Sequence, residues 1–405
     1  MVEFAKGARQ AEGSVVREIL KVTARPEVIS LAGGLPAPEL FPTDALARAA
    51  ARVFERDGAP ALQYSTTEGH PALREWIAAQ FARRGAPARA DEVVVTAGSQ
   101  QGLDLAARLF LEPGALAAVE EPGYLAAIQA FRLAGADLAG VPVDAGGIDL
   151  DALDALCRRR RVRLVYTVSE FQNPTGVTLA AERRARLVEL ADRHGFVVVD
   201  DNPYGALRYE GAFPPAVAAG RTAGQTALEG PGRVVSLGSF SKVLAPGLRL
   251  GYVMAAGPIL ERLVFVKQAA DLHTTSLGQR LAADFLASED LDAHLGRLRR
   301  EYARRRDALL AALPDALPVG STWTRPDGGM FVWVTLPPGW DAMALFHAAV
   351  AADVAFVPGA PFYIDQSRPE AARTLRLNFS NSTPERIDEG LRRLRAAVQR
   401  VAPAR

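Results

Sequence analysis

The chain has 405 residues, of which 49% are hydrophobic, so it can bury a large core and form two or three domains, or one large domain with an appendage. Its 47 basic and 46 acidic residues give a formal net charge of +1, which argues against a polyanionic partner such as nucleic acid. No segment stays apolar long enough to cross a bilayer and no export signal is recognisable, so we expect a cytoplasmic protein without a membrane partner.

Short apolar runs alternate with helical patterns through the first three quarters of the chain. The strand-like runs cover residues 93–95, 116–119, 162–168, 196–199, 234–237 and 252–254. Segments between them, such as 100–111 and 182–194, repeat apolar residues at helical spacing. Strands without polar alternation indicate a mostly parallel sheet covered by helices on both faces, with ligands bound at the carboxyl ends of its strands. We therefore predict an α/β fold.

The pattern changes after about residue 291 to a long Arg-rich helix, followed by strand-like segments at 328–334 and 374–379. We expect a large domain over residues 46–290 and a smaller α+β domain over 291–405. Residues 1–45, with a short helix pattern at 15–22, would form an arm that packs with the smaller domain. The single cysteine, Cys157, excludes an internal disulfide, and the five histidines lack metal-ligand spacing, so no metal is expected.

The segment Ser239-Phe240-Ser241-Lys242, with Arg249 shortly after it, has the residue types needed to hold an aldehyde cofactor with a phosphate. A lysine amine condenses with an aldehyde, while serines and a bidentate arginine bind a phosphate dianion. Pyridoxal 5'-phosphate is the candidate. Taken alone, the segment is equally compatible with a surface loop in which a lysine follows a serine.

Three further segments meet the other needs of such a cofactor. Asp201, at the end of an apolar run, could keep the ring nitrogen protonated, and Tyr204 could hydrogen-bond the ring oxygen. The amides of a helix beginning at Ser99-Gln100 could bind the phosphate, and Tyr124 could stack on the ring. In isolation each also has an ordinary interpretation: a carboxylate in a turn, a helix N-cap without a ligand, and a packed tyrosine.

Read in order, these segments resemble the fold type I, class I and II aminotransferases that use pyridoxal phosphate. The resemblance covers nearly the whole chain and rests on Gly33-Gly34-Leu35-Pro36, Tyr64, Gly69 with Leu73-Arg74, Gly98-Ser99-Gln100, Glu121-Pro122 with Tyr124, Gln172-Asn173-Pro174-Thr175-Gly176, Asp201 with Pro203-Tyr204, Ser239-Phe240-Ser241-Lys242, Gly329-Met330-Phe331 with Trp333, and Leu375-Arg376-Leu377-Asn378-Phe379. Gly-Gly-Leu-Pro and Ser-Phe-Ser-Lys are similar to the subgroup of 2-aminoadipate and kynurenine aminotransferases, which includes bacterial enzymes of lysine biosynthesis. The implied fold is a large domain with a seven-stranded, mostly parallel sheet and a smaller α+β domain.

The resemblance implies a role for each matching residue. Lys242 would join the cofactor and act as general base, with Asp201 and Tyr204 as the other catalytic residues. Asp201 would pair with the ring nitrogen, Asn173 and Tyr204 with the ring oxygen, and Tyr124 with the ring face. The phosphate ligands would be Ser99, Gln100, Ser239, Ser241 and Arg249, joined by Tyr64 of a second subunit, which implies a homodimer.

On the substrate side, the resemblance implies that Arg376 binds the α-carboxylate, helped by Asn173 and Gly34. Arg17 would meet a distal carboxylate, or else be an exposed helix arginine. The implied reaction moves an amino group from an amino acid to an oxo acid, 2-oxoglutarate, by a ping-pong mechanism, with 2-aminoadipate, aromatic and branched-chain amino acids as candidate donors. The alternatives are another pyridoxal-phosphate enzyme, such as a β-lyase or decarboxylase, and a regulatory module that binds the cofactor.

Two positions depart from the subgroup's pattern. Ser169-Glu170 replaces a segment that usually contains a proline, and Thr66 replaces the proline of Tyr-Ser-Pro. Neither change removes an expected cofactor ligand. Both leave the shape of the substrate pocket open.

Overall fold

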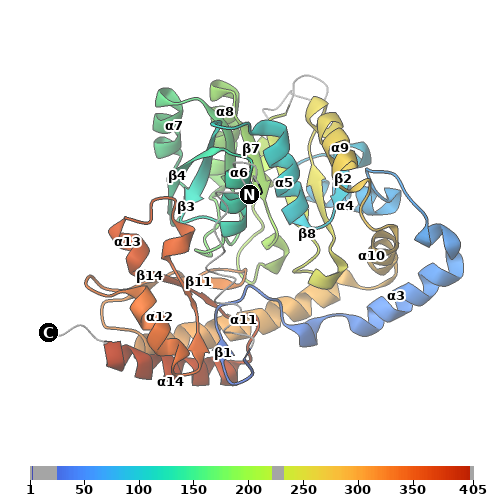
Figure 1. Ribbon diagram of the computed structural model, residues 1–405. Coiled ribbons are helices and arrows are strands. Elements are labelled where there is room, and N and C mark those ends of the chain that lie inside the picture. The colour runs from blue at the N-terminus through green and yellow to red at the C-terminus, as the bar shows by residue number, and fades with distance from the viewer. Residues whose placement is uncertain (1, 3–24, 221–231, 402–405) are drawn as a thin grey trace.

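A computed structural model describes residues 2, 25–220 and 232–401 of the chain (Figure 1). The predicted helix at 15–22, and Arg17 within it, lie outside the described residues. The described residues form three sheets: a large one shown in the upper half of Figure 1, a smaller one below it, and a two-stranded pair. The observed fold is α/β, as predicted.

The large sheet has eight strands in the order β2-β9-β8-β7-β6-β3-β4-β5. Its strands are β2 (Val93–Thr96), β3 (Leu116–Glu121), β4 (Asp137–Asp144), β5 (Gly147–Ile148), β6 (Val162–Thr167), β7 (Val197–Asp201), β8 (Val234–Ser239) and β9 (Gly251–Met254). The pairs formed by β4, β3, β6, β7 and β8 are parallel, whereas β9 is antiparallel to both of its neighbours. The sheet has one strand more than the seven expected, because the two-residue β5 forms a hairpin with β4. All six predicted strand-like runs are strands of this sheet.

Strand β4 was not predicted from the sequence. Its residues 137–142 pair with β3, but Val141 is the one buried residue of the strand and the others are partly or fully exposed, so its burial does not alternate. It also contains Gly140 and Pro142, which are rare inside strands. Its position beside β3 therefore depends on the tertiary structure more than on local sequence preference.

Helices cover both faces of the large sheet, which explains the continuous apolar character of its central strands. The helices are α3 (Thr43–Arg56), α4 (Pro71–Arg83), α5 (Ser99–Phe110), α6 (Leu125–Leu133), α7 (Leu150–Arg159), α8 (Ala181–His194), α9 (Pro258–Asp271) and α10 (Ser276–Ser288). Leu103 of α5, Phe131 of α6 and Leu263 of α9 belong to one apolar core, and Ile77 of α4 and Leu187 of α8 belong to a second. Successive residues of a strand alternate between the two cores.

The smaller sheet is antiparallel, in the order β10-β11-β14-β13, and packs with helices through one shared apolar core. Its elements are α11 (Leu291–Ala316), β10 (Thr322–Trp323), β11 (Phe331–Thr335), α12 (Ala342–Val350), β13 (Val357–Pro358), α13 (Pro369–Ala372), β14 (Thr374–Asn378) and α14 (Pro384–Val401). The long helix α11 and α14 run side by side beneath this sheet (Figure 1). Both strand-like segments predicted in this region, and the long Arg-rich helix, are present.

The segment before α3 lies against the elements that follow residue 291. Strand β1 (Ile29–Ser30) pairs with β12 (Val354–Ala355), and the amide of Ala37 donates to the Tyr302 hydroxyl at 3.0 Å. Residues 29–37 therefore contact this region, while the packing of residues 1–45 as an arm and the domain boundaries at residues 45 and 290 stay predictions. Within residues 2, 25–220 and 232–401, none of the helices combines the length and apolar character needed to cross a membrane.

Candidate active site

A cavity of about 480 Å³ lies where the parallel strands of the large sheet end. It is lined by Gly34, Gly98, Ser99, Gln100, Tyr124, Leu125, Ala126, Gln129, Val168, Asn173, Asp201, Pro203, Tyr204, Ser239, Ser241, Lys242, Pro246, Arg249, Phe331, Phe362 and Arg376. Asp201 and Ser239 are the last residues of β7 and β8, and Val168 follows β6. Of the predicted site residues that the structure describes, the cavity therefore brings together all except Tyr64.

Lys242 lies in the turn after β8, and its Nζ donates a hydrogen bond to the carbonyl of Gly34 at 2.9 Å. Burial, followed by the positive charges of Arg376 and Arg249, lowers the pKa of Lys242 to about 8. A substantial fraction of this amine is therefore neutral near neutral pH, the form in which an amine is nucleophilic and basic.

Asp201 ends β7, and its carboxylate is almost fully buried. Oδ2 accepts a hydrogen bond from the Tyr166 hydroxyl at 2.9 Å, whereas Oδ1 has no partner among the described residues. Burial raises the pKa of Asp201 to about 7, opposed by the Tyr166 hydrogen bond. An unpaired buried carboxylate oxygen is costly, so the site fits a cationic donor such as a protonated ring nitrogen.

An anion-binding cradle is built around the start of α5. The helix begins at Ser99 without a side-chain cap, preceded by Gly98 in a left-handed conformation with φ of 82°. A Cβ at Gly98 would lie 2.8 Å from a guanidinium nitrogen of Arg249, and one at Gly251 would lie 2.6 Å from the amide of Ser99. These glycines therefore allow Arg249 and the helix N-terminus to approach one point. Free amides and a guanidinium fit a phosphate dianion.

Arg376 projects from β14 at the cavity and is buried. Its Nη1 donates to Asn173 Oδ1 at 2.7 Å and its Nη2 to the carbonyl of Ala32 at 2.7 Å, while Nε has no partner among the described residues. Its guanidinium lies 4.3 Å from the ring centre of Phe331 and 5.2 Å from that of Phe362. Burial lowers the pKa of Arg376 to about 10, so it stays a cation at neutral pH.

Two tyrosines complete the wall. Tyr124 directly precedes α6, and burial, followed by the nearby Asp201, raises its pKa to about 12. Tyr204 is buried, its ring lies 5.8 Å from that of Phe331 at 87°, and burial raises its pKa above the ordinary value. Both therefore keep their hydroxyl protons at neutral pH, so each is a hydrogen-bond donor.

Tyr64 does not line the cavity within a single chain. Its side chain is 79% exposed and packs edge-on against His273, with ring centres 5.7 Å apart. Tyr64 is therefore not part of the cavity of its own chain, and its expected role stays a prediction. Arg17 cannot be placed, because it lies outside the described residues.

Sequence reasoning missed Tyr166, Phe331 and Phe362 as site residues, and left the departure at Glu170 open. Tyr166 had a recognisable signal, because a hydroxyl within an apolar strand needs a buried partner. The aromatic residues come from distant segments and had no such signal. Neither Glu170 nor Thr66 lines the cavity.

Cys157 lies near the end of α7, where burial raises its thiol pKa to about 11, so it is not an activated thiol. Among the described residues, no group of three or more His, Cys, Asp or Glu side chains is arranged to hold a metal ion.

The family described as aminotransferase class I and II matches residues 26–394. A 2-aminoadipate transaminase from Thermus thermophilus is 44% identical over 397 residues, which cover 98% of this chain and 96% of the relative. An aromatic-amino-acid aminotransferase from Thermococcus litoralis is 40% identical over 98% of this chain and 94% of its own length. The crystal structure of a Pyrococcus horikoshii kynurenine aminotransferase superimposes with a TM-score of 0.91, at 39% identity, covering 99% of this chain and 98% of the other.

The comparisons and the cavity agree. The donor set of the cavity fits pyridoxal phosphate: an unpaired buried carboxylate oxygen, an uncapped helix N-terminus beside an arginine, and a lysine amine. The chain belongs to the class I and II aminotransferase family and is a pyridoxal-phosphate-dependent transaminase of the 2-aminoadipate and kynurenine aminotransferase subgroup.

Proposed function

We propose that this enzyme moves an amino group from an aromatic, branched-chain or 2-aminoadipate donor to 2-oxoglutarate, with both substrates using one cavity in turn in a ping-pong cycle. The observation that carries the proposal is the convergence of Lys242, Asp201, Arg376 and the start of α5 on a single cavity of about 480 Å³. A volume of this size is typical of a small-molecule site.

When bound, pyridoxal phosphate supplies an aldehyde that carries the amino group and a ring that withdraws electrons from the substrate's α-carbon. The amides of Ser99 and Gln100, the hydroxyls of Ser239 and Ser241, and Arg249 would hold its phosphate. That set combines a helix N-terminus with a guanidinium, the two groups most suited to a dianion.

The ring would be held by the residues on the opposite wall. Asp201 would place its unpaired Oδ1 against the ring nitrogen and hold the proton there, while the Tyr166 hydroxyl fixes Oδ2. Asn173 and Tyr204 would bind the ring oxygen, and Tyr124 would cover one ring face. Because Asp201 is buried, its charge would act with little screening by water.

Lys242 would act as the general base that moves a proton between the substrate's α-carbon and the cofactor's C4' atom. Its pKa of about 8 suits this role, because a base is most effective when its pKa lies near the working pH. The Gly34 carbonyl accepts a hydrogen from the amine and holds it in the cavity, which leaves the lone pair of the neutral amine free to take the proton.

Arg376 would bind the substrate's α-carboxylate, because a planar guanidinium binds a carboxylate through two parallel hydrogen bonds. The cations that line the described cavity are Lys242, Arg249 and Arg376, and these assignments use all three. The remaining wall includes Leu125, Phe331 and other apolar groups, which suit an aromatic or branched side chain. A distal carboxylate, as in 2-aminoadipate, would need a further cation, and Arg17 stays our prediction for it.

The enzyme would work as a homodimer in which Tyr64 of each copy reaches the phosphate of the other. Tyr64, Leu62, Phe265 and Leu272 are exposed large side chains, and a second copy that covered them would bury apolar surface. A cytoplasmic location stays a prediction from the sequence.

Incubation with 2-oxoglutarate and a panel of donors (2-aminoadipate, glutamate, leucine, phenylalanine and kynurenine) tests the proposal. Transamination gives glutamate and a new oxo acid from each accepted donor, whereas a β-lyase or decarboxylase gives other products. Lys242→Ala should abolish turnover but keep some noncovalently bound cofactor. Turnover of Lys242→Ala at the parent's rate would exclude the role given to Lys242.

A further inference from the structure

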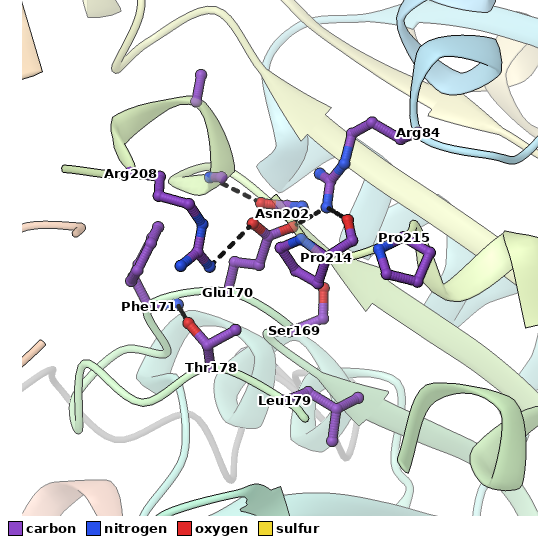
Figure 2. Close-up of polar contacts among 12 residues, drawn as sticks. Arg84, Ser169, Glu170, Phe171, Thr178, Leu179, Asn202, Arg208, Pro214 and Pro215 are labelled. Carbon is purple, nitrogen blue, oxygen red and sulfur yellow. Dashed lines mark hydrogen bonds and ion pairs between the residues drawn. The ribbon is translucent and has the colours of Figure 1, made fainter. Parts of the chain in front are cut away.

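A buried ionic cluster lies at the base of the loop that carries Asn173 (Figure 2). We call it the Glu170 cluster: Glu170, Arg84, Arg184, Asn202 and Arg208. The Glu170 side chain is fully buried, and three guanidinium groups lie within 4 Å of its carboxylate. None of the five residues lines the cavity.

The Glu170 carboxylate is shared by groups from separate elements. Oε1 accepts hydrogen bonds from Arg84, which follows α4, and from Nδ2 of Asn202 at 2.7 Å. Oε2 lies 3.7 Å from Nη2 of Arg208. Figure 2 shows these three side chains pointing at Glu170 from different directions. One carboxylate therefore connects three parts of the fold.

Asn202 makes this connection relevant to the cavity, because it stands between Asp201 and Tyr204. Its backbone amide donates to the Leu237 carbonyl at 3.0 Å, and its Oδ1 accepts from the amide of Gly205 at 2.8 Å. The remaining Nδ2 group reaches Glu170, three residues before Asn173. The hydrogen bond between Asn202 and Glu170 thus ties the turn that carries Asp201 and Tyr204 to the loop that carries Asn173.

The loop has a second fixed point at Phe171, whose φ of 52° lies in the left-handed region. Such a conformation in a bulky residue is unfavourable and persists only where its surroundings hold it. The guanidinium of Arg208 lies 4.7 Å from the centre of the Phe171 ring. Arg208 thus contacts both Glu170 and Phe171.

The negative charge of Glu170 balances arginines of the cluster that differ in how many other partners they have. Arg84 also donates to the Pro214 carbonyl at 2.8 Å, and Arg184 donates to three carbonyls. The Arg208 side chain, by contrast, makes one hydrogen bond, from Nη1 to the Glu210 carbonyl at 3.3 Å. Its Nε and Nη2 have no hydrogen-bond partner among the described residues, although Nη2 is ion-paired with Glu170. Without the Glu170 charge, a buried Arg208 would have to move.

We propose that Glu170 is a positioning residue that sets the distance between Asn173 and the Asp201–Tyr204 turn, and so fixes the plane of the cofactor ring. The inference rests on the proposed ring contacts of those three residues. Glu170 touches neither substrate nor cofactor. It acts through Asn202 on one side and through Phe171 on the other.

Two variants test this inference. Glu170→Gln removes the shared charge. Asn202→Ser keeps all the charges and removes the bond between loop and turn, while its hydroxyl can replace Oδ1 as the acceptor for the Gly205 amide. We expect each to raise the dissociation constant of pyridoxal phosphate about tenfold, which corresponds to about 1.4 kcal/mol. We also expect the midpoint pH of the visible absorbance of the bound cofactor to move, because the ring nitrogen and oxygen lose their alignment. Affinity is measured by equilibrium dialysis and the midpoint by pH titration.

Asp284→Asn is the matched control. Asp284 is a buried carboxylate that accepts from Arg52 at 2.8 Å and from Arg56 at 3.0 Å, and it does not line the cavity. The Asp284→Asn variant should lose thermal stability, while its cofactor affinity and absorbance midpoint stay at the parent's values.

If Asn202→Ser binds the cofactor within twofold of the parent and keeps its midpoint, the inference is wrong, whether or not Glu170→Gln folds. The proposed function fails in a distinguishable way: the parent itself would then show no visible absorbance with pyridoxal phosphate, or Lys242→Ala would turn over donors at the parent's rate.

Discussion

The carboxylate of Asp201 should make the cofactor-free protein less stable as the pH rises. Its pKa is raised from 3.8 to about 7 by burial, so the folded state holds the proton more tightly than the unfolded chain does. Well below pH 3.8, Asp201 is protonated in both the folded and the unfolded state and does not lower the free energy of unfolding. Between pH 3.8 and about 7, the unfolded state ionises first, and the stability due to the bound proton is progressively lost.

The magnitude follows from the two pKa values. With 1.36 kcal/mol for each pKa unit, the cost of Asp201 is about 2 kcal/mol at pH 5 and about 4 kcal/mol at pH 8. Asn cannot ionise and can still accept from Tyr166. Between pH 5 and pH 8, the free energy of unfolding of Asp201→Asn should therefore rise by about 2 kcal/mol relative to that of the parent. The variant should also lose cofactor affinity.

Urea unfolding of the cofactor-free proteins at pH 5, 6.5 and 8 measures this difference. The holoenzyme is the control, because a ring nitrogen against Oδ1 should favour the ionised carboxylate and reduce the dependence on pH. If the difference between Asp201→Asn and the parent is the same at all three pH values without cofactor, the reasoning about Asp201 is refuted.

Four further predictions concern the binding of cofactor and substrate. The rate of covalent attachment of added pyridoxal phosphate to the cofactor-free protein should increase as the pH rises through about 8, the pKa of Lys242. Stopped-flow absorbance measures this rate, and an inflection nearer pH 10.5 would show that burial is unimportant. Gly251→Ala should weaken cofactor binding more than substrate binding, because its Cβ would lie 2.6 Å from the Ser99 amide. An unchanged cofactor affinity in equilibrium dialysis would contradict the assignment of the phosphate to the start of α5. Arg376→Lys should lower kcat/KM about tenfold or more for every donor, because an ammonium cannot replace the bidentate hydrogen bonding of a guanidinium. Arg17→Ala should lower kcat/KM for 2-aminoadipate and leave it unchanged for leucine. An equal loss for both donors would remove the role of Arg17.

The Glu170 cluster shows how a departure from a family pattern can act at a distance. The sequence marked Ser169-Glu170 as unusual but gave no direction for the side chain. In the fold, Glu170 does not line the cavity but lies among three arginines from other segments. Asn202 connects it to the turn that carries Asp201 (Figure 2). Selection of substrate by direct contact is therefore not its role.

The sequence by itself determined the elements whose signal is local. The apolar runs that become β6, β7 and β8 need no partner to be recognised, because both faces of a parallel sheet are buried. The motifs around Lys242, Asp201 and Asn173 were also recognisable, because each of their chemical roles demands particular residue types.

Only the tertiary structure decided what depends on pairing between distant segments. Strand β4 needs β3 beside it, Tyr166 acquires its function only where Oδ2 of Asp201 meets it, and Arg376 reaches Asn173 across 203 positions of the chain. The pKa values of Lys242 and Asp201 likewise result from burial and neighbouring charges, which are properties of the folded chain. Local sequence specifies which groups are present, and long-range packing specifies which of them meet and how strongly their charges interact.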